Sequence, residues 1–542
     1  MIKDLTLSNN KKGDDQMTSV NRKLPVGIQD FESLRKGQYV YVDKTEYIYR
    51  LVHSGKPYFL SRPRRFGKSL FLSTLKAYFE GKRELFKGLR IEELEGDDPD
   101  SWQSYPVFYF DLNKKNYKAD HALEEVLAAH LIDYEKIYGD ENKACPLEER
   151  FQRILVSAVE QTGKEAVVLV DEYDKPLLEA ADERMADHNK AVFKGFFSTL
   201  KSYDEYLQFV FITGVTKFSK ISIFSDLNQL NDITMNEDFA DICGITEKEM
   251  KRCFMPEIEM LAKKQKLSVE ECLQTLKDKY DGYHFHYESE GVYNPFSLLK
   301  AFFEKNFGSY WFETGTPTFL VKKINSSSFD VQRFTNERLY SNEKSLSDYR
   351  IDNPDLVPLL YQTGYLTIVG YDARKQRFTM GFPNDEVKYG FLESLLPVYT
   401  PEVAANSGKD IYTLDDCIEA GDTDGVKDIL TALFASIPYT TENNPFEHYF
   451  QTVIYLVFTL LGKLTKCEVH SSQGRADCIL ESEDYVYIFE FNLDKSAKEA
   501  LEQIEEKGYA LPYAADERKV IRIGVSFDSK IRNISDWKVL TE

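Results

Sequence analysis

The sequence has few of the features that mark membrane or secreted proteins. No stretch approaches about 18 consecutive apolar residues, and the longest apolar run, Val453 to Leu461, has the length of a buried helix. Residues 1–20 are polar and lack the apolar stretch of a signal peptide. The seven cysteines include no C-x-x-C pair, which favours reduced thiols over a disulfide framework. We therefore expect a cytoplasmic protein with no membrane partner.

The chain also lacks an excess of basic residues. Its formal net charge is −21, whereas proteins that coat nucleic acid non-specifically need a basic surface to release counterions. Local basic clusters remain compatible with this charge. The length of 542 residues exceeds one hydrophobic core and predicts about two to four domains. Hydrophobic residues make up 42% of the chain, which is enough to build those cores and indicates a globular protein.

One segment has the order strand, loop, helix. The apolar run Tyr58–Leu60 is followed by a loop rich in Arg and Pro, and Gly-Lys-Ser at 67–69 then opens an amphipathic helix over 70–79. Unpaired backbone N–H groups at a helix N-terminus bind phosphate, the Lys adds a point charge for the outer phosphates, and the Ser hydroxyl reaches Mg²⁺. The pattern indicates a nucleotide P-loop, although Arg62 holds the place of its usual first glycine.

A second motif supports the P-loop. The β-branched run Ala166–Val170 predicts a strand buried on both faces, and it ends in Asp171 and Glu172. This is typical of a Walker B motif, in which Asp171 holds Mg²⁺ and Glu172 orients the attacking water. Thr213 ends a further core strand, where a γ-phosphate sensor would lie, and a purely structural hydroxyl is the alternative.

These motifs resemble those of a known family. Tyr41–Thr45, Phe59–Leu70, Val170–Leu177 and Phe211–Phe218 are similar to segments of the bacterial AAA-ATPase-like proteins that carry a C-terminal nuclease-superfamily domain. The resemblance extends over nearly the whole chain from about residue 23. Arg commonly takes the position of Arg62 in that family. The resemblance implies an ATP-binding core with ATP and Mg²⁺ as cofactors, whereas spacing alone leaves GTP open.

The nucleotide-binding residues can be carried over to this chain. Three arginines in the loop are expected to lie against phosphate or a neighbouring subunit, with a solvated basic loop as the alternative. Ser69 and Asp171 are the expected metal ligands. The full set expected at the nucleotide is Arg62, Arg64, Arg65, Phe66, Gly67, Lys68, Ser69, Leu70 and Thr213.

The C-terminal region predicts a second α/β fold. Asp477 on its second strand and Glu490 on its third indicate the layout of a PD-(D/E)XK nuclease. Two carboxylates on adjacent strands can share a Mg²⁺ ion that polarises the scissile phosphate and activates water. Glu447 and Gln503 take the places of accessory groups in that superfamily. The expected elements are, in order, a helix over 446–464, strands over 467–470, 475–480 and 486–493, a helix over 496–508 and a strand over 520–527.

One residue departs from the nuclease pattern. The motif should read Glu-x-Lys, but this chain has Asn492 two residues after Glu490. Asn donates a hydrogen bond yet carries no charge, so it cannot give the same stabilisation of the transition state. Lys495 or Lys498 could supply that charge from a different backbone position. The pattern therefore leaves cleavage open in a domain that keeps the fold.

Together the segments predict an α/β protein whose P-loop core contains a parallel sheet. Two functions stay open: ATP hydrolysis that controls nucleic-acid cleavage, or a nucleotide-dependent binding module with an inactive nuclease fold. ATP is the expected ligand, and nucleic acid and a homo-oligomer are open as partners. The expected parts are a disordered tail (1–22), the P-loop core (23–245), a helical lid or winged-helix-like region (246–385), a helical connector (386–440) with its clearest helix at 413–433, and the nuclease-like domain (441–542).

Overall fold

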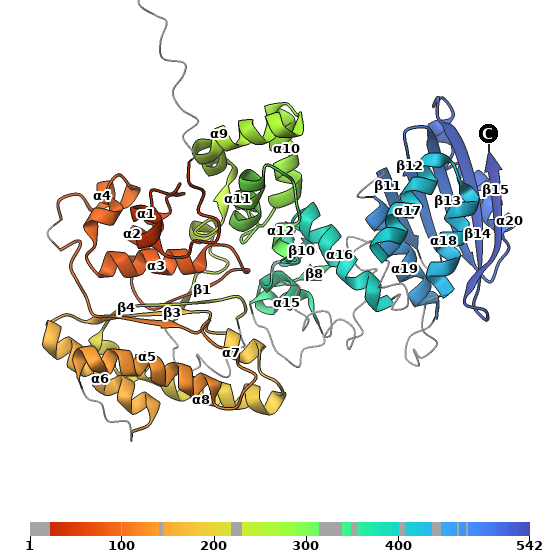
Figure 1. Cartoon of the computed structure of the whole chain (residues 1–542). Helices are drawn as coiled ribbons and strands as arrows, with labels where there is room; N and C mark the ends of the chain where they lie inside the picture. The colour runs from red at the N-terminus through yellow and green to blue at the C-terminus, as the bar shows by residue number, and fades with distance from the viewer. Residues whose placement is uncertain are drawn as a thin grey trace, which may run out of the picture.

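The computed structural model shows an N-terminal α/β core, a central helical region and a C-terminal α/β domain (Figure 1). For residues 397–399, 407–410, 446–451, 466–472 and 475–477 it describes the backbone alone. The described residues are 22–98, 100–139, 145–217, 230–313, 339–347, 355–399, 407–435, 446–462, 466–472 and 475–541.

The N-terminal core is built on a five-stranded parallel sheet of order β2-β3-β4-β1-β5. β3 is buried along its whole length, as its run of β-branched residues predicts. In the register of the central pair, Tyr58 of β1 lies opposite Phe211 of β4, so both strands end at the same edge. The strands are β1 (Tyr58–Ser61), β2 (Val107–Asp111), β3 (Ala166–Asp171), β4 (Leu207–Gly214) and β5 (Asn231–Asp232).

Helices cover both faces of this sheet, which gives three layers (Figure 1). The predicted helix over 70–79 is confirmed, and α8 begins at Glu183, where Asp182 caps it by accepting from Met185 N. One face carries α1 (Phe31–Lys36), α2 (Thr45–Val52), α3 (Lys68–Phe79) and α4 (Arg90–Glu95), and the other carries α5 (Ala122–Tyr138), α6 (Leu147–Thr162), α7 (Lys175–Leu178) and α8 (Glu183–Ser202).

The central region consists of helices followed by a small antiparallel sheet of order β8-β10-β9. Thr246 and Ser268 each form a capping box with the glutamate three residues later, which fixes the starts of α9 and α10. The helices agree with the prediction for this region, and its description as a lid or winged-helix-like region stays a prediction. Its elements are β6 (Ile245–Thr246), α9 (Glu247–Gln265), α10 (Val269–Tyr280), β7 (Val292–Tyr293), α11 (Pro295–Glu304), α12 (Tyr310–Glu313), β8 (Tyr340–Ser341), α14 (Glu343–Leu346), α15 (Val357–Gln362), β9 (Thr367–Asp372), β10 (Arg377–Gly381) and α16 (Asp385–Tyr399).

The C-terminal domain has a mixed sheet of order β11-β12-β13-β14-β15, in which only β13 and β14 pair in parallel. The strand β15 was not predicted. Among the described residues, no helix anywhere in the chain combines the length and apolar character needed to cross a bilayer. The elements are α17 (Ser407–Ala420), α18 (Thr423–Ala435), α19 (Phe446–Leu461), β11 (Lys466–Ser472), β12 (Arg475–Glu481), β13 (Tyr485–Leu493), α20 (Ala497–Lys507), β14 (Lys519–Asp528) and β15 (Asn533–Thr541).

Alternation along β13 assigns its two faces. Phe489 and Phe491 pack their rings against Phe458 of α19, whereas Ile488 packs with Ile504 of α20 on the opposite face. The helix predicted over 413–433 is instead two helices, α17 and α18, because Gly421 between them has a φ of 73° that a continuous helix does not allow. Tyr487 Oη donates to the carbonyl of Ile418 at 2.7 Å, so α17 packs against this domain.

Candidate functional site

The loop between β1 and α3 forms a sharp turn that leaves a helix N-terminus exposed. Arg65 and Gly67 both have positive φ, 70° and 92°, and a glycine adopts this conformation at no steric cost. Gly67 is the N-cap of α3, and no side chain caps the first turn. The backbone N–H groups of that turn are therefore available to an anion.

The ammonium of Lys68 is buried and is surrounded by the backbone of this loop. The side chain is 5% exposed, and Nζ donates to the carbonyls of Arg62 (2.8 Å) and Pro63 (3.0 Å). Burial lowers the pKa of Lys68, while the nearby carboxylates of Glu172 and Asp171 act in the opposite direction. The ammonium therefore lies at the N-terminus of α3 and is bound by two carbonyl groups. Phosphate oxygens of a ligand could replace these two carbonyls as its acceptors.

Asp171 ends β3 directly beside the P-loop. It is 3% exposed, and burial raises the pKa of its carboxyl, while a hydrogen bond with Ser69 and the charge of Lys68 lower it. Tyr109 Oη also donates to Asp171 Oδ2 at 3.3 Å. A hydroxyl and a carboxylate side by side are hard oxygen donors of the kind Mg²⁺ prefers, so the two predicted ligands, Ser69 and Asp171, fit this ion.

Glu172 and Thr213 flank the same edge of the sheet. Glu172 has a positive φ of 52°, unusual for a non-glycine residue, and burial raises the pKa of its carboxyl. Thr213 is fully buried, and its Oγ1 has no hydrogen-bond partner among the described residues. Tyr173 N donates to the carbonyl of Thr213 at 3.1 Å, so the turn after β3 is tied to the end of β4. An unsatisfied buried hydroxyl here suits a γ-phosphate oxygen.

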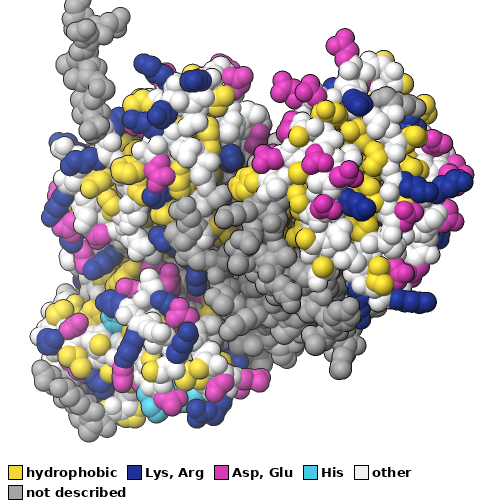
Figure 2. All heavy atoms as spheres, turned by 45° about the vertical axis from the view of Figure 1, so that its right-hand side comes forward, with side chains coloured by type: hydrophobic (Ala, Val, Ile, Leu, Met, Phe, Trp, Pro, Cys, Tyr) yellow, Lys and Arg dark blue, Asp and Glu magenta, His cyan; other side chains and the backbone are white. Residues whose placement is uncertain are grey.

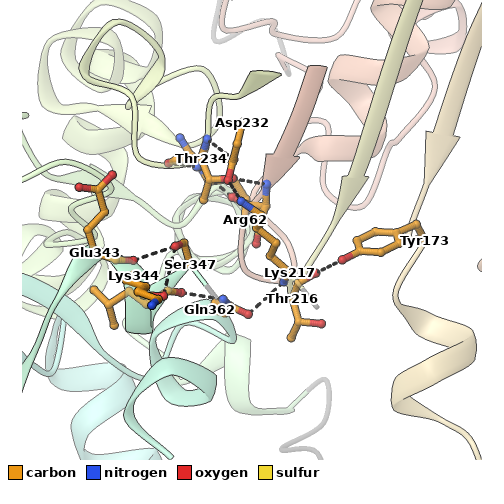
Figure 3. Close-up of polar contacts among 12 residues, drawn as sticks. Arg62, Tyr173, Thr216, Lys217, Asp232, Thr234, Glu343, Lys344, Ser347 and Gln362 are labelled. Carbon is orange, nitrogen blue, oxygen red and sulfur yellow. Dashed lines mark hydrogen bonds and ion pairs between the residues drawn. The ribbon is translucent and has the colours of Figure 1, made fainter. Parts of the chain in front are cut away.

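Arg62 differs from its predicted role at the phosphate. Its guanidinium is buried and lies 4.0 Å above the ring of Phe285. It also donates to backbone carbonyls of the segment after β5, among them that of Thr234 (Figure 3). Because these contacts occupy both Nη atoms, we assign Arg62 a structural role in place of phosphate binding. The accepting carbonyls are those of Ser61, Thr234, Phe239 and Ala240.

The remaining loop residues connect the P-loop to the central region. Phe66 is buried and contacts the rings of Tyr283 and Phe285 edge-on. Arg64 and Arg65 are exposed, and the guanidinium of Arg65 lies 4.6 Å from the ring centroid of Phe296. The expectation that these two arginines meet phosphate or a second subunit stays a prediction. Leu70 is half-buried on the first turn of α3.

Two polar residues that sequence reasoning missed complete this edge. Asp174 is buried, and its Oδ2 accepts from Thr216 N (2.6 Å) and Thr216 Oγ1 (2.8 Å), which clamps the turn after β3 to the segment after β4. Gln362 at the end of α15 accepts from Lys217 N at 3.0 Å (Figure 3). The position of Asp174 three residues after Asp171 was the available signal, whereas Gln362 carries none because its partner is distant in sequence.

The second candidate site lies on the face of β13 that α20 covers. Glu490 is fully buried and stands in register with Asp477 of β12 and with Gly524 of β14. Nζ of Lys507, at the end of α20, lies 3.5 Å from Glu490 Oε1. The side chains of Asp477 and Glu447 lie outside the described part of the chain.

Two amides accompany this carboxylate. Asn492 is 3% exposed, and its Nδ2 is buried with no hydrogen-bond partner in the described structure. Gln503 Nε2 on α20 is also buried without a described partner. Of the lysines predicted to replace the motif lysine, Lys498 instead pairs with Glu502 at 3.4 Å and is largely exposed. The register of Asp477 and Glu490 fits an oxygen-ligated Mg²⁺ ion.

Comparisons with known proteins agree with this division into two sites. Residues 25–224 match the model of a predicted AAA-ATPase, and residues 445–537 match the PD-(D/E)XK nuclease superfamily. A protein of Azotobacter chroococcum mcd 1, described as "Uncharacterized protein in vnfD 5'region", is 36% identical over 533 residues, which cover 96% of this chain and 99% of that relative. No solved structure matches the chain. The chain belongs to the family of predicted AAA-ATPases that carry a C-terminal domain of the PD-(D/E)XK nuclease superfamily.

Proposed function

We propose that the protein hydrolyses ATP and that the nucleotide state controls cleavage of nucleic acid by the C-terminal domain. The observation that carries the first half is the convergence of Lys68, Asp171 and Thr213 at one edge of the parallel sheet. Each is buried, and each is of the type that contacts a nucleoside triphosphate.

In the ATPase step the residues of this edge have separate roles. The N–H groups of the first turn of α3 hold the phosphates, and the ammonium of Lys68 exchanges its carbonyl partners for phosphate oxygens. Thr213 Oγ1 donates to the γ-phosphate, and the carboxylate of Glu172 orients the attacking water. Mg²⁺ held by Ser69 and Asp171 would supply positive charge to the phosphates.

Contacts between the P-loop and the central region support a lid role for the latter. Phe66 packs on Tyr283 and Phe285, and Trp311 Nε1 donates to the carbonyl of Arg64 at 3.3 Å. Gln362 adds a contact to the segment that follows Thr213. Movement of the loop on binding ATP would therefore reach the central helices through packed side chains.

The C-terminal domain supplies the second activity. Asp477 and Glu490 would hold Mg²⁺, which polarises a scissile phosphate. Figure 2 shows Lys and Arg side chains interspersed with Asp and Glu over the visible described face, which fits the net charge of −21 and favours a local contact with nucleic acid over a broad basic surface.

A second function rests on Asn492. Without a lysine at this position the domain could bind nucleic acid or a protein and cleave nothing, so that ATP would control binding alone. ATP-controlled cleavage and ATP-controlled binding differ in their products, because only cleavage releases shortened strands of nucleic acid.

The test measures phosphate release by the full chain with ATP and Mg²⁺, alone and with DNA or RNA, together with cleavage of labelled strands. We expect ATP turnover, and strand cleavage that depends on Mg²⁺ and is lost in Glu490→Gln. ATP turnover with intact strands would favour the binding module, and absence of ATP turnover would contradict the proposal.

A further inference from the structure

Lys507 places a positive charge at the nuclease-like site from an unexpected element. It is the last residue of α20, and its Nζ lies 3.5 Å from Oε1 of the fully buried Glu490. The Lys507 side chain is 32% exposed, so its ammonium contacts a buried carboxylate while part of the side chain reaches solvent. Such a position gives a substrate phosphate access to the charge.

The backbone around Lys507 fixes this position. A capping box between Ser496 and Glu499 sets the start of α20, and Gly508, with a φ of 66°, ends the helix directly after Lys507. Gly524 lies opposite Glu490 on β14, and a Cβ there would overlap the carbonyl oxygen of Ala497. The missing side chain therefore lets α20 lie close to the sheet at the level of Glu490.

Polar groups from two elements surround the same carboxylate. Gln503 precedes Lys507 by four residues, which places both on one face of α20. Asn492 follows Glu490 by two residues, which places both on one face of β13. The buried Nε2 of Gln503 and Nδ2 of Asn492 have no hydrogen-bond partner among the described residues. The site therefore holds these two amide donors beside the ammonium that pairs with Glu490.

We propose that Lys507 is the catalytic lysine of the C-terminal domain and supplies from α20 the charge that Asn492 lacks. This inference rests on the proposed nuclease function. In hydrolysis the oxygen of water bonds to phosphorus and one P–O ester bond breaks. The proton released by the water passes to solvent, and the leaving oxygen takes a proton from solvent. Lys507 stabilises the negative charge that develops on the phosphate oxygens.

The test compares variants of the full chain for Mg²⁺-dependent cleavage of labelled DNA and RNA. Lys507→Met should lower the rate about 100-fold or more, because a preorganised donor at the developing charge is removed. Lys498→Met is the matched control, since that lysine lies on the same helix, is exposed and pairs with Glu502; it should cleave at the wild-type rate. Asn492→Lys in the Lys507→Met background should restore cleavage about tenfold or more, which a structural ion pair would not do.

Calorimetry with Mg²⁺ gives a second readout that does not depend on activity. Lys507→Met should bind Mg²⁺ at least as tightly as the wild type, because the ammonium no longer competes for Glu490, and Glu490→Gln should bind it more weakly. Wild-type cleavage that Glu490→Gln abolishes but Lys507→Met leaves intact would overturn the role of Lys507 and keep the nuclease. Absence of cleavage by both the wild type and Asn492→Lys would overturn the nuclease function and this inference with it.

Discussion

At the scale of single residues, buried charged groups define the P-loop region. Lys68 and Asp171 are buried beside the predicted nucleotide position, where a ligand can pair with each of them. Arg62 is equally buried, but its guanidinium pairs with carbonyls of the segment after β5, whereas Lys68 pairs with two carbonyls of the P-loop itself. Burial alone therefore does not mark a ligand-binding residue, and the position of its partners decides its role.

The structural role of Arg62 predicts a loss of stability. Arg62→Ala would leave buried carbonyls without donors and empty the space above Phe285, so we expect the free energy of unfolding to fall by about 3 kcal/mol. Arg64→Ala is the matched control because Arg64 is exposed, and it should change stability by less than about 0.5 kcal/mol. Urea unfolding measures both, and equal stabilities of the two variants would refute the assignment.

Glu386 on α16 predicts a pH dependence of stability. Burial raises the pKa of its carboxyl from 4.5 to about 7, and the backbone N–H of Trp311, which donates to Oε1 at 2.8 Å, opposes this rise. The native state therefore binds this proton more tightly than the unfolded state. The contribution of Glu386 to the free energy of unfolding is fully present below pH 4.5 and is lost as the pH rises through 7.

Glu386→Gln removes this titration and keeps an acceptor for Trp311. Its stability relative to the wild type should increase by about 3 kcal/mol between acidic solution and pH 8. Glu259→Gln, a change at an exposed position on α9, should follow the wild type. Chemical unfolding at several pH values provides the measurement, and parallel curves for Glu386→Gln and the wild type would contradict the burial argument.

At the scale of elements, periodicity predicted what local sequence determines. Strands β1, β3 and β4 and helices α3, α5 and α6 follow their apolar patterns closely. β15 was missed because it is an edge strand whose side chains are mostly exposed, so it lacks the alternation that marks a half-buried strand. The contact of Lys507 with Glu490 and the contacts of Arg62 join residues from different elements, and no local pattern encodes them.

Because α20 lies close to the sheet, adding one methyl group at Gly524 should lower the stability of the protein. Gly524→Ala should displace α20, because the new Cβ would meet the backbone of Ala497, and should destabilise the protein by about 1–3 kcal/mol. Gly195→Ala is the matched control: this glycine lies within α8, no atom lies within 4 Å of the added Cβ, and alanine favours the helix. Thermal unfolding compares the two, and an unchanged Gly524→Ala protein would show that α20 is not closely seated.

At the scale of the whole molecule, the P-loop lies between the parallel sheet and the central region. One side of the loop faces Asp171 and Thr213, and the other packs on the central region through Phe66. The sequence predicted the two motifs of the AAA-ATPase-like domain and the candidate carboxylates of the nuclease-like domain because each pattern is local in the chain. It did not predict Gln362 as the link to the central region, because that contact joins positions 145 residues apart.

The most direct test of the account measures ATP binding and hydrolysis together in three forms of the full chain. A fluorescent ATP analogue with Mg²⁺ reports binding, and phosphate release reports hydrolysis. We predict that the wild type binds and hydrolyses ATP and that Lys68→Ala does not bind it. Glu172→Gln should bind ATP but release phosphate at a rate lowered by a factor of about 100 or more. Binding by Lys68→Ala equal to the wild type, or equal loss of binding in both variants, would contradict the assignment of this edge as an ATPase site.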